Sequence, residues 1–203
     1  MLKKYFPQIL LGIYFIEFII AGINPYSRSV WYAENIPILV LVIFFVFLFC
    51  IKIRFSNIAY LLMFVLPFLH TIGGHYTFEL VPFDWFNNLF GFTRNMFDRV
   101  GHFTVGFYAF PVAEYLISRK LVTKKIIAVT YAIFLIAFIA VFYEWIEWWY
   151  AVFFGGASGS AFLGSQGDIW DAQKDMLMDV LGAVATMIMY LIVKYKNKLE
   201  AEA

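Results

Sequence analysis

The sequence predicts an all-α polytopic transmembrane helix bundle, built as a single integral membrane domain over residues 1–203. The first observation is composition, because 63% of the residues are hydrophobic and 14% are charged. Soluble domains are instead about 45–50% apolar and about 25% charged. The second observation is that apolar runs recur along the chain without a polar face, as helices that cross a bilayer require. The third is a single cysteine, Cys50, which excludes a disulfide-stabilised scaffold.

Six segments are long enough to cross the hydrocarbon core, which takes about 20 helical residues. We place them at residues 5–24, 36–51, 56–75, 99–118, 126–146 and 172–193. The first segment carries Glu17 and lacks a small-residue cleavage pattern, so we expect a retained helix rather than a removed signal peptide. An aromatic-rich stretch near residues 78–97 suits an interfacial or re-entrant segment better than a seventh span.

The lysines and arginines are distributed unequally across this layout. Eleven of the 15 fall on the side of both termini, and four fall on the other side. Because short cytoplasmic segments are enriched in Lys and Arg, we expect both termini to be cytoplasmic. Topology and contact with lipid explain the basic segments, so the lipid bilayer is the expected partner and nucleic acid is not.

The last predicted span carries an acidic face. Asp168, Asp171, Asp175 and Asp179, followed by Gly182, occupy an arc of about 80° on a helix that turns 100° per residue. Charged residues within a span are costly and usually face the interior of the bundle. We therefore expect the deeper aspartates to point inward and find partners.

Other segments bring polar side chains to the same outer ends of the bundle. They are Arg94, Asp98 and His102 at i, i+4 and i+8, the pair Glu144 and Glu147, and the third-span histidines His70 and His75. Taken singly, each has a structural explanation as an interface residue, a helix cap or a member of an ion pair, such as Asp98 with Arg94 or Arg99. Taken together, the convergence of four helices at one depth favours a functional pocket.

Clustered carboxylates with imidazoles suit a divalent metal ion, general acid–base catalysis or a proton-coupled carrier. The spacing does not select among these, and a divalent metal ion is the one cofactor that the residues indicate. The candidate roles are catalytic for Asp98, His102, Glu144 and Asp175; substrate-binding for Arg94, Glu147 and Gln173; and metal-binding for His75, Asp168 and Asp171.

Four blocks of sequence carry a family resemblance over roughly residues 60–190. They are GHYTF at 74–78, RNMFDRVGHF at 94–103, YEWIEW at 143–148 and GDIWDAQKDM at 167–176. In order and content they resemble the YjdF-type family of bacterial inner-membrane proteins. More loosely, Asp98 with His102, and Asp175 with Asp179, are similar to the pattern of VanZ-like membrane proteins. Both resemblances imply a multi-pass protein of the bacterial cytoplasmic membrane, and neither brings an established activity.

Three functional classes remain open. The first is a metal-assisted hydrolase or transferase that acts on a lipid or lipid-linked substrate from an outward-facing site. The second is a small proton- or cation-coupled carrier, although the chain is short and shows no inverted repeat. The third is a non-catalytic accessory protein whose polar cluster is structural.

Overall fold

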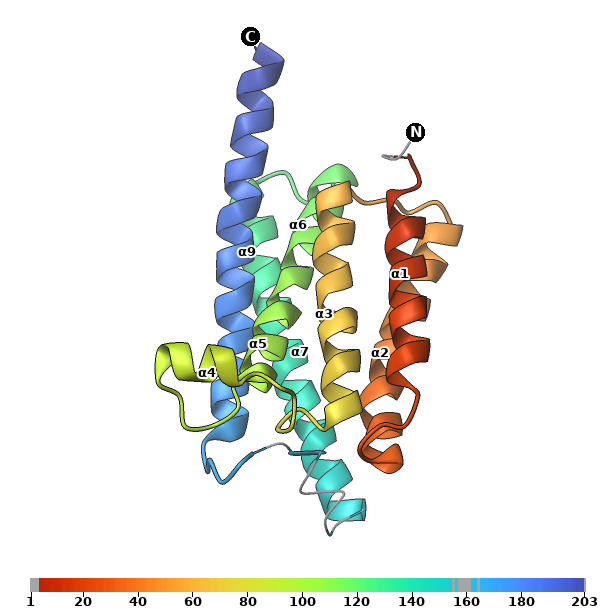
Figure 1. The fold of residues 1–203 in the computed structure, drawn as a ribbon. Helices are drawn as coiled ribbons and strands as arrows, with labels where there is room; N and C mark the ends of the chain where they lie inside the picture. The colour runs from red at the N-terminus through yellow and green to blue at the C-terminus, as the bar shows by residue number, and fades with distance from the viewer. Residues whose placement is uncertain (1–3, 155, 157–161, 164, 203) are drawn as a thin grey trace.

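The computed structural model describes residues 4–154, 156, 162–163 and 165–202 of the chain. The regular secondary structure of these residues is helical (Figure 1). The elements are α1 (Phe6–Ala21), α2 (Arg28–Cys50), α3 (Asn57–Tyr76), α4 (Asp84–Phe90), α5 (Phe97–Val105), the 3-10 turn η2 (Gly106–Tyr108), α6 (Ala109–Ser118), α7 (Lys125–Phe154) and α9 (Asp171–Glu202). The long helices run side by side, with both chain termini at one end (Figure 1). The predicted all-α membrane bundle is confirmed.

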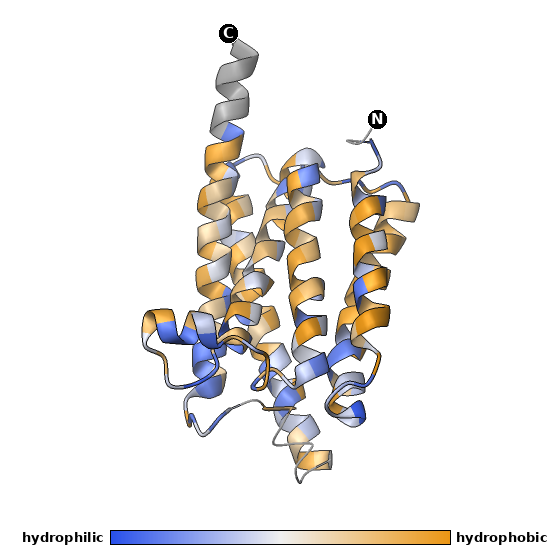
Figure 2. Ribbon diagram, viewed as in Figure 1, coloured by the Kyte–Doolittle hydropathy of each residue, from blue (hydrophilic) through white to orange (hydrophobic). Residues whose placement is uncertain are grey.

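All six segments predicted to span the membrane are helical. Four helices, α2, α3, α7 and α9, are long and apolar enough to cross a membrane by length and composition, and α1 is apolar but shorter. The fourth predicted span consists of three consecutive pieces, α5, η2 and α6, along one path through the bundle (Figure 1). Hydropathy follows this arrangement, because apolar residues cover the long helices and polar residues gather toward the ends (Figure 2).

The break in the fourth span coincides with two local features. Pro111 has no N–H, so the carbonyl of Phe107 loses the donor that a continuous α-helix would provide. One turn earlier, Gly106 lies against Gly182 of α9, and a Cβ on either glycine would collide with the backbone of the other helix. Small residues allow the backbones of membrane helices to approach closely. This glycine contact therefore fixes α5 and η2 directly against α9.

The second span begins earlier than predicted. Its helix starts at Arg28 rather than at residue 36, because Ser27 caps the N-terminus and its Oγ accepts a hydrogen bond from the N–H of Val30 at 3.4 Å. The helix continues through Pro37. The correction matters for the site, because Glu34 and Asn35 become buried residues inside α2 rather than loop residues before it.

The segment predicted not to span the membrane contains α4, which lies across the direction of the long helices (Figure 1). Gly91 ends this helix in the left-handed conformation, with φ of +69°. Trp85, Leu89 and Phe90 are exposed on its surface. An apolar surface on a short crosswise helix suits the membrane interface.

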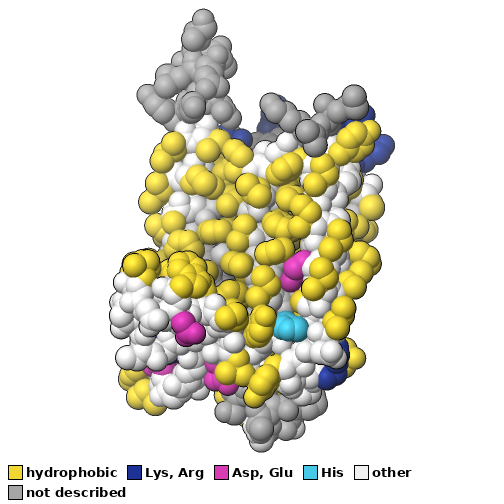
Figure 3. Space-filling view, in the orientation of Figure 1, with side chains coloured by type: hydrophobic (Ala, Val, Ile, Leu, Met, Phe, Trp, Pro, Cys, Tyr) yellow, Lys and Arg dark blue, Asp and Glu magenta, His cyan; other side chains and the backbone are white. Residues whose placement is uncertain are grey.

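The bundle has an inner seam of small residues and an apolar outer surface. Ala128, Ala132 and Ala140 of α7 and Ala183 of α9 are fully or almost fully buried, so these helices pack closely. Hydrophobic side chains cover most of the middle of the face shown in Figure 3. Exposed apolar side chains along the helices are the arrangement expected of a surface that faces lipid.

Replacing Ser56 with Ala tests the N-terminal cap of α3. The Ser56 Oγ accepts a hydrogen bond from the N–H of Ala59 at 3.3 Å. Its loss should lower the free energy of unfolding by about 1 kcal/mol, measured by thermal unfolding in a mild detergent. Ser118, whose Oγ bonds the carbonyl of Tyr115 on the exposed surface, is the matched control. An equal effect of Ser118→Ala would contradict the capping role.

Candidate functional site

The acidic face of α9 packs against α5 at the end of the bundle opposite to the chain termini. Arg99 of α5 lies at the centre of the contact, with a side chain that is 4% exposed. One of its terminal nitrogens binds Asp175 and the other binds Asp171. The same guanidinium lies 3.5 Å from Asp98 and 3.6 Å from Asp168. Arg99 therefore joins four of the aspartates into one ion network.

Arg94 lies nearer the mouth of this network. Its guanidinium bonds Asp171 at 2.6 Å and approaches Asp168 at 3.5 Å and Asp98 at 3.8 Å. Asp168 also accepts a hydrogen bond from Lys174 at 2.6 Å. This bond from Lys174 is the main reason why the pKa of Asp168, which precedes α9, is lower than its usual value.

His102 extends the network inward from α5. Its Nδ1 lies 3.3 Å from Asp179, and its Nε2 lies 3.5 Å from Asp175 and 3.7 Å from Asp98. With the proton on Nδ1, the imidazole donates to Asp179 and presents the Nε2 lone pair toward the other two carboxylates. Asp98, His102 and Asp175 each offer one ligand atom within 4.8 Å of the others. These three side chains form the candidate metal site.

A cavity of about 1170 Å³ opens beside this cluster. Most of its lining is apolar and comes from α2, α6 and α7. One end is polar, where the ionisable lining residues are Glu34, His70, Asp98, His102, Glu147 and Asp179, with the hydroxyl-bearing Tyr143 beside them. The cavity is therefore amphipathic: a long apolar compartment ends in acids and histidines.

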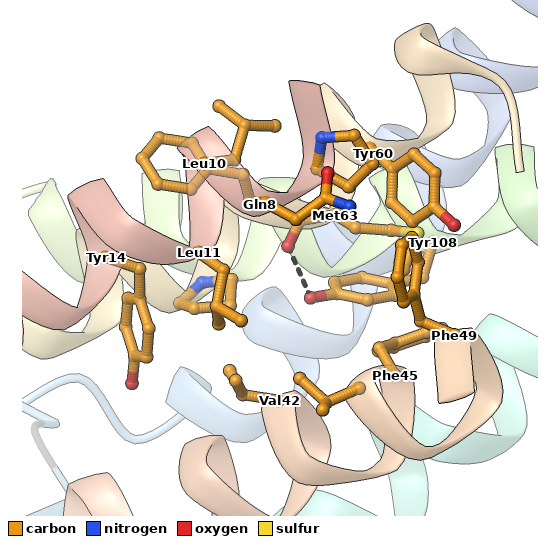
Figure 4. A pocket seen from close by; sticks show the side chains of 14 residues that line it. Gln8, Leu10, Leu11, Tyr14, Val42, Phe45, Phe49, Tyr60, Met63 and Tyr108 are labelled. Atoms are coloured by element: carbon orange, nitrogen blue, oxygen red, sulfur yellow. Dashed lines mark hydrogen bonds between the residues drawn. The ribbon is translucent and has the colours of Figure 1, made fainter. Parts of the chain in front are cut away.

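A second cavity, of about 170 Å³, lies between α1, α2 and α3 (Figure 4). Leu10, Leu11, Val42 and aromatic rings line it, and the Tyr108 hydroxyl on its wall donates a hydrogen bond to the carbonyl of Met63 at 2.7 Å. No Asp, Glu or His is among its described lining residues. The smaller cavity thus lacks the acid–base groups of the larger one.

The structure brings most of the predicted site residues together but separates two of them. Glu147 lines the large cavity, and Glu144 is buried with one carboxylate oxygen that has no hydrogen-bond partner in the part of the chain that the structure describes. Gln173, predicted to bind substrate, is exposed on α9. His75, predicted to bind metal, points toward α1, where its Nδ1 lies 2.7 Å from the carbonyl oxygen of Ala21.

Sequence reasoning missed three residues of the site. For Arg99, the sequence indicates only a possible ion pair with Asp98, and the predicted second span, which starts at residue 36, excludes Glu34. For His70, the sequence predicts a place at the outer end of the third span but no role; in the structure it lies 3.0 Å from Glu34, and both are buried. The available signal for Glu34 is its position two residues before a long apolar run, because an acid inside a span costs free energy unless it has a partner.

These features define a class: a multi-pass helical membrane protein with an acid–histidine cluster at one end of an amphipathic cavity. The chain belongs to the family described as "Predicted membrane protein (DUF2238)", whose model matches residues 6–196. It is similar to "Inner membrane protein YjdF" of Escherichia coli (strain K12), with 31% identity over 172 residues that cover 84% of this chain and 81% of that protein. No solved structure matches the chain.

The family match confirms the resemblance to YjdF-type proteins. Together with the apolar helices, it supports a place in the inner membrane. Neither match is to a VanZ-like protein, so that similarity rests on the pattern of aspartates and His102 alone.

Proposed function

We propose that this protein is a membrane enzyme, a metal-assisted hydrolase or transferase, that acts on a lipid or lipid-linked substrate. The observation that carries the proposal is the continuity between the candidate metal site and the large apolar cavity, since Asp98 and His102 line both. An amphiphile placed there has its polar group at the acids and its hydrocarbon chain along the helices.

The shape of the cavity supports a long-chain substrate. Its lining follows α2 from Glu34 to Leu48, which corresponds to about 21 Å at a rise of 1.5 Å per residue. That length is about two thirds of a hydrocarbon core about 30 Å thick. Helices α2 and α7 both line the cavity, yet α2 packs mainly on α3, while α7 packs on α6 and α9. A lipid has a lateral route between α2 and α7.

The charge balance supports a bound cation. The network contains five aspartates, at 98, 168, 171, 175 and 179, and three fixed cations, Arg94, Arg99 and Lys174. With all of these groups ionised and His102 neutral, as a metal ligand must be, two negative charges remain uncompensated. A divalent ion held by Asp98, His102 and Asp175 would offset them. When bound, it would polarise an oxygen of the substrate or of the attacking water.

Asp179 has a positioning role in this arrangement. Metal-binding histidines usually donate their second ring N–H to a carboxylate, which fixes the tautomer and the orientation of the ring. Asp179 lies 3.3 Å from Nδ1 of His102, on the side of the ring away from the candidate ligands. The sequence interpretation of Asp179 as a deep inward-facing acid agrees with this position.

The carrier alternative receives less support from the same geometry. Past Asp179, the inner face of α9 continues with Gly182, packed on Gly106, and then with buried Ala183 and Met187. Two acids of the described residues remain for a path toward the terminal end: Glu17 of α1, which does not line the large cavity, and Glu114, which accepts a hydrogen bond from the Ser56 N–H at 2.6 Å. A proton-coupled carrier needs a polar path through the bundle, and this packed apolar layer interrupts it.

Orientation follows from the basic residues. The α2–α3 and α6–α7 connections lie at the same end as both termini (Figure 1). These segments and the termini contain the 11 Lys and Arg residues noted above, so the rule that cytoplasmic segments are basic favours cytoplasmic termini. In this orientation the acid–histidine cluster faces the outer leaflet.

Metal binding by the purified protein tests the proposal. We expect the wild type to bind about one Mn²⁺ per chain through carboxylate and imidazole ligands, measured by titration with electron paramagnetic resonance. The Asp98→Ala/His102→Ala variant should lose this binding, and Asp179→Asn should weaken it about 10- to 100-fold.

His75→Gln provides the control, because His75 lies at the α1–α3 contact instead. Equal Mn²⁺ binding by the wild type and the double variant would contradict the proposed metal site.

Activity is tested by incubating the metal-loaded wild type with lipids extracted from its own membrane. We expect a new product by mass spectrometry, and absence of product would contradict the enzymatic function.

A further inference from the structure

A second acid–histidine pair lines the same cavity and comes from different helices. His70 of α3 and Glu34 of α2 lie 3.0 Å apart, and their side chains are 11% and 5% exposed. Both line the large cavity together with Asp98 and His102. The pair is separate from the Arg99 network, which joins α5 to the segment around α9.

The contact with Glu34 uses one ring nitrogen of His70, Nε2, and leaves the imidazole its second nitrogen for another partner. Nε2 lies at ion-pair distance from a Glu34 carboxylate oxygen, and no well-directed hydrogen bond to this nitrogen is found among the described residues. The Tyr143 hydroxyl, also on the cavity wall, has no hydrogen-bond partner among the described residues. A buried polar atom without a partner is costly, so the Tyr143 hydroxyl on this wall points to a polar group of a ligand.

Phe78 fixes the position of His70 relative to the candidate metal site. The ring of Phe78 meets the His70 imidazole edge-on, with centroids 4.9 Å apart. The same ring lies near Gly101, where a Cβ would be 3.7 Å from it, and Gly101 directly precedes His102. Phe78 therefore lies between His70 and the backbone that carries His102.

The backbone that places Phe78 beside His70 has an uncommon conformation. Thr77 and Phe78 both have positive φ, 66° and 46°, and the Phe78 N–H donates to the carbonyl of Gly73 at 2.7 Å. Positive φ is unfavourable for a β-branched or bulky residue, and such strain persists where the surrounding structure enforces it, often at functional sites. Gly73 makes room, since a Cβ there would meet the Phe78 ring.

We propose that His70 is the proton-transferring residue of the reaction, positioned by Glu34 and Phe78; this assignment rests on the enzymatic function proposed above. In hydrolysis of an ester-type bond, the oxygen of water bonds to the acyl or phosphoryl centre while His70 takes the proton. The bond from that centre to the leaving oxygen then breaks, and His70 returns the proton to that oxygen. Glu34 stabilises the imidazolium between the two transfers.

The test compares two histidines of one helix in the full-length protein in lipid nanodiscs loaded with Mn²⁺. Incubated with lipids extracted from its own membrane, His70→Gln should form product at least about 100-fold more slowly than the wild type, as loss of a general acid–base demands. His75→Gln should stay within about threefold, because this histidine faces α1 and not the cavity. Mn²⁺ affinity should be unchanged in both variants.

Chemical rescue separates proton transfer from a structural role. The rate of His70→Ala should rise at least about tenfold when imidazole is added, since the free base replaces the lost group. Unchanged product formation by His70→Gln, or absence of rescue in a folded, Mn²⁺-binding His70→Ala, would overturn the role of His70 and leave the enzymatic function standing. Absence of product from the wild type would overturn both.

Discussion

Replacing Arg99 with Leu should lower the free energy of unfolding by about 3–5 kcal/mol, because the change leaves buried carboxylates without their cation. Arg99 is the group that binds both Asp171 and Asp175 inside the bundle. Removing its charge does not restore hydration to these aspartates, which are 11% and 3% exposed. Thermal or denaturant unfolding in a mild detergent, followed by tryptophan fluorescence, measures the effect.

Two further variants define the origin of that loss. Arg119→Leu removes an exposed arginine that lies near the Tyr115 ring and should change stability by no more than about 0.5 kcal/mol. Combining Arg99→Leu with Asp175→Asn should recover part of the stability, since the double change removes both members of the pair. A loss no greater than that of Arg119→Leu would show that Arg99 does not stabilise the bundle.

Gly182→Ala should destabilise the protein by about 1–3 kcal/mol, the usual cost of adding atoms to a closely packed interior. A Cβ at position 182 would overlap the backbone carbonyl of Phe103, and backbone atoms have little freedom to move aside. The sign of this change in the free energy of unfolding is diagnostic. In a helix without such a close contact, alanine is more favourable than glycine by about 1 kcal/mol.

Gly12 provides the control for Gly182, because it is a helical glycine without a close neighbour. It lies inside α1, and a Cβ there would have no neighbour within 4 Å. Gly12→Ala should therefore leave the midpoint of thermal unfolding unchanged or raise it, whereas Gly182→Ala should lower it. If both substitutions raised the midpoint, the close contact between α5 and α9 would be refuted.

The predictable part of the fold followed from local patterns. Apolar length indicated the helices, and the spacing of Asp171, Asp175 and Asp179 placed them on one inward face of α9, where the structure has them buried. Both patterns depend on the rise and turn of a single helix. The start of α2 was wrong by eight residues, since the cap at Ser27 and the helix through Pro37 outweigh a hydropathy boundary.

The two histidines of α3 show where local reasoning ended. His70 and His75 are about 7.5 Å apart along the axis of α3, and five residues correspond to about 140° around a helix. One side chain therefore lines the cavity while the other faces α1. The sequence placed both at the right end of the bundle but could not decide which of them faces the site, because that depends on how α3 is rotated against its neighbours.

By itself, the sequence determined that this protein is a multi-pass helical bundle with acids and histidines gathered at one end, because hydropathy and helical period are properties of neighbouring residues. Only the tertiary structure decided that Arg99 binds Asp171 and Asp175, that Glu34 joins His70, and that an apolar cavity ends at these groups. Partners more than 70 residues apart, such as Arg99 and Asp175, meet because Gly106 and Gly182 let two helix backbones touch. This close contact sets the rotation of each helix about its axis, and that rotation cannot be predicted from the sequence of either segment alone.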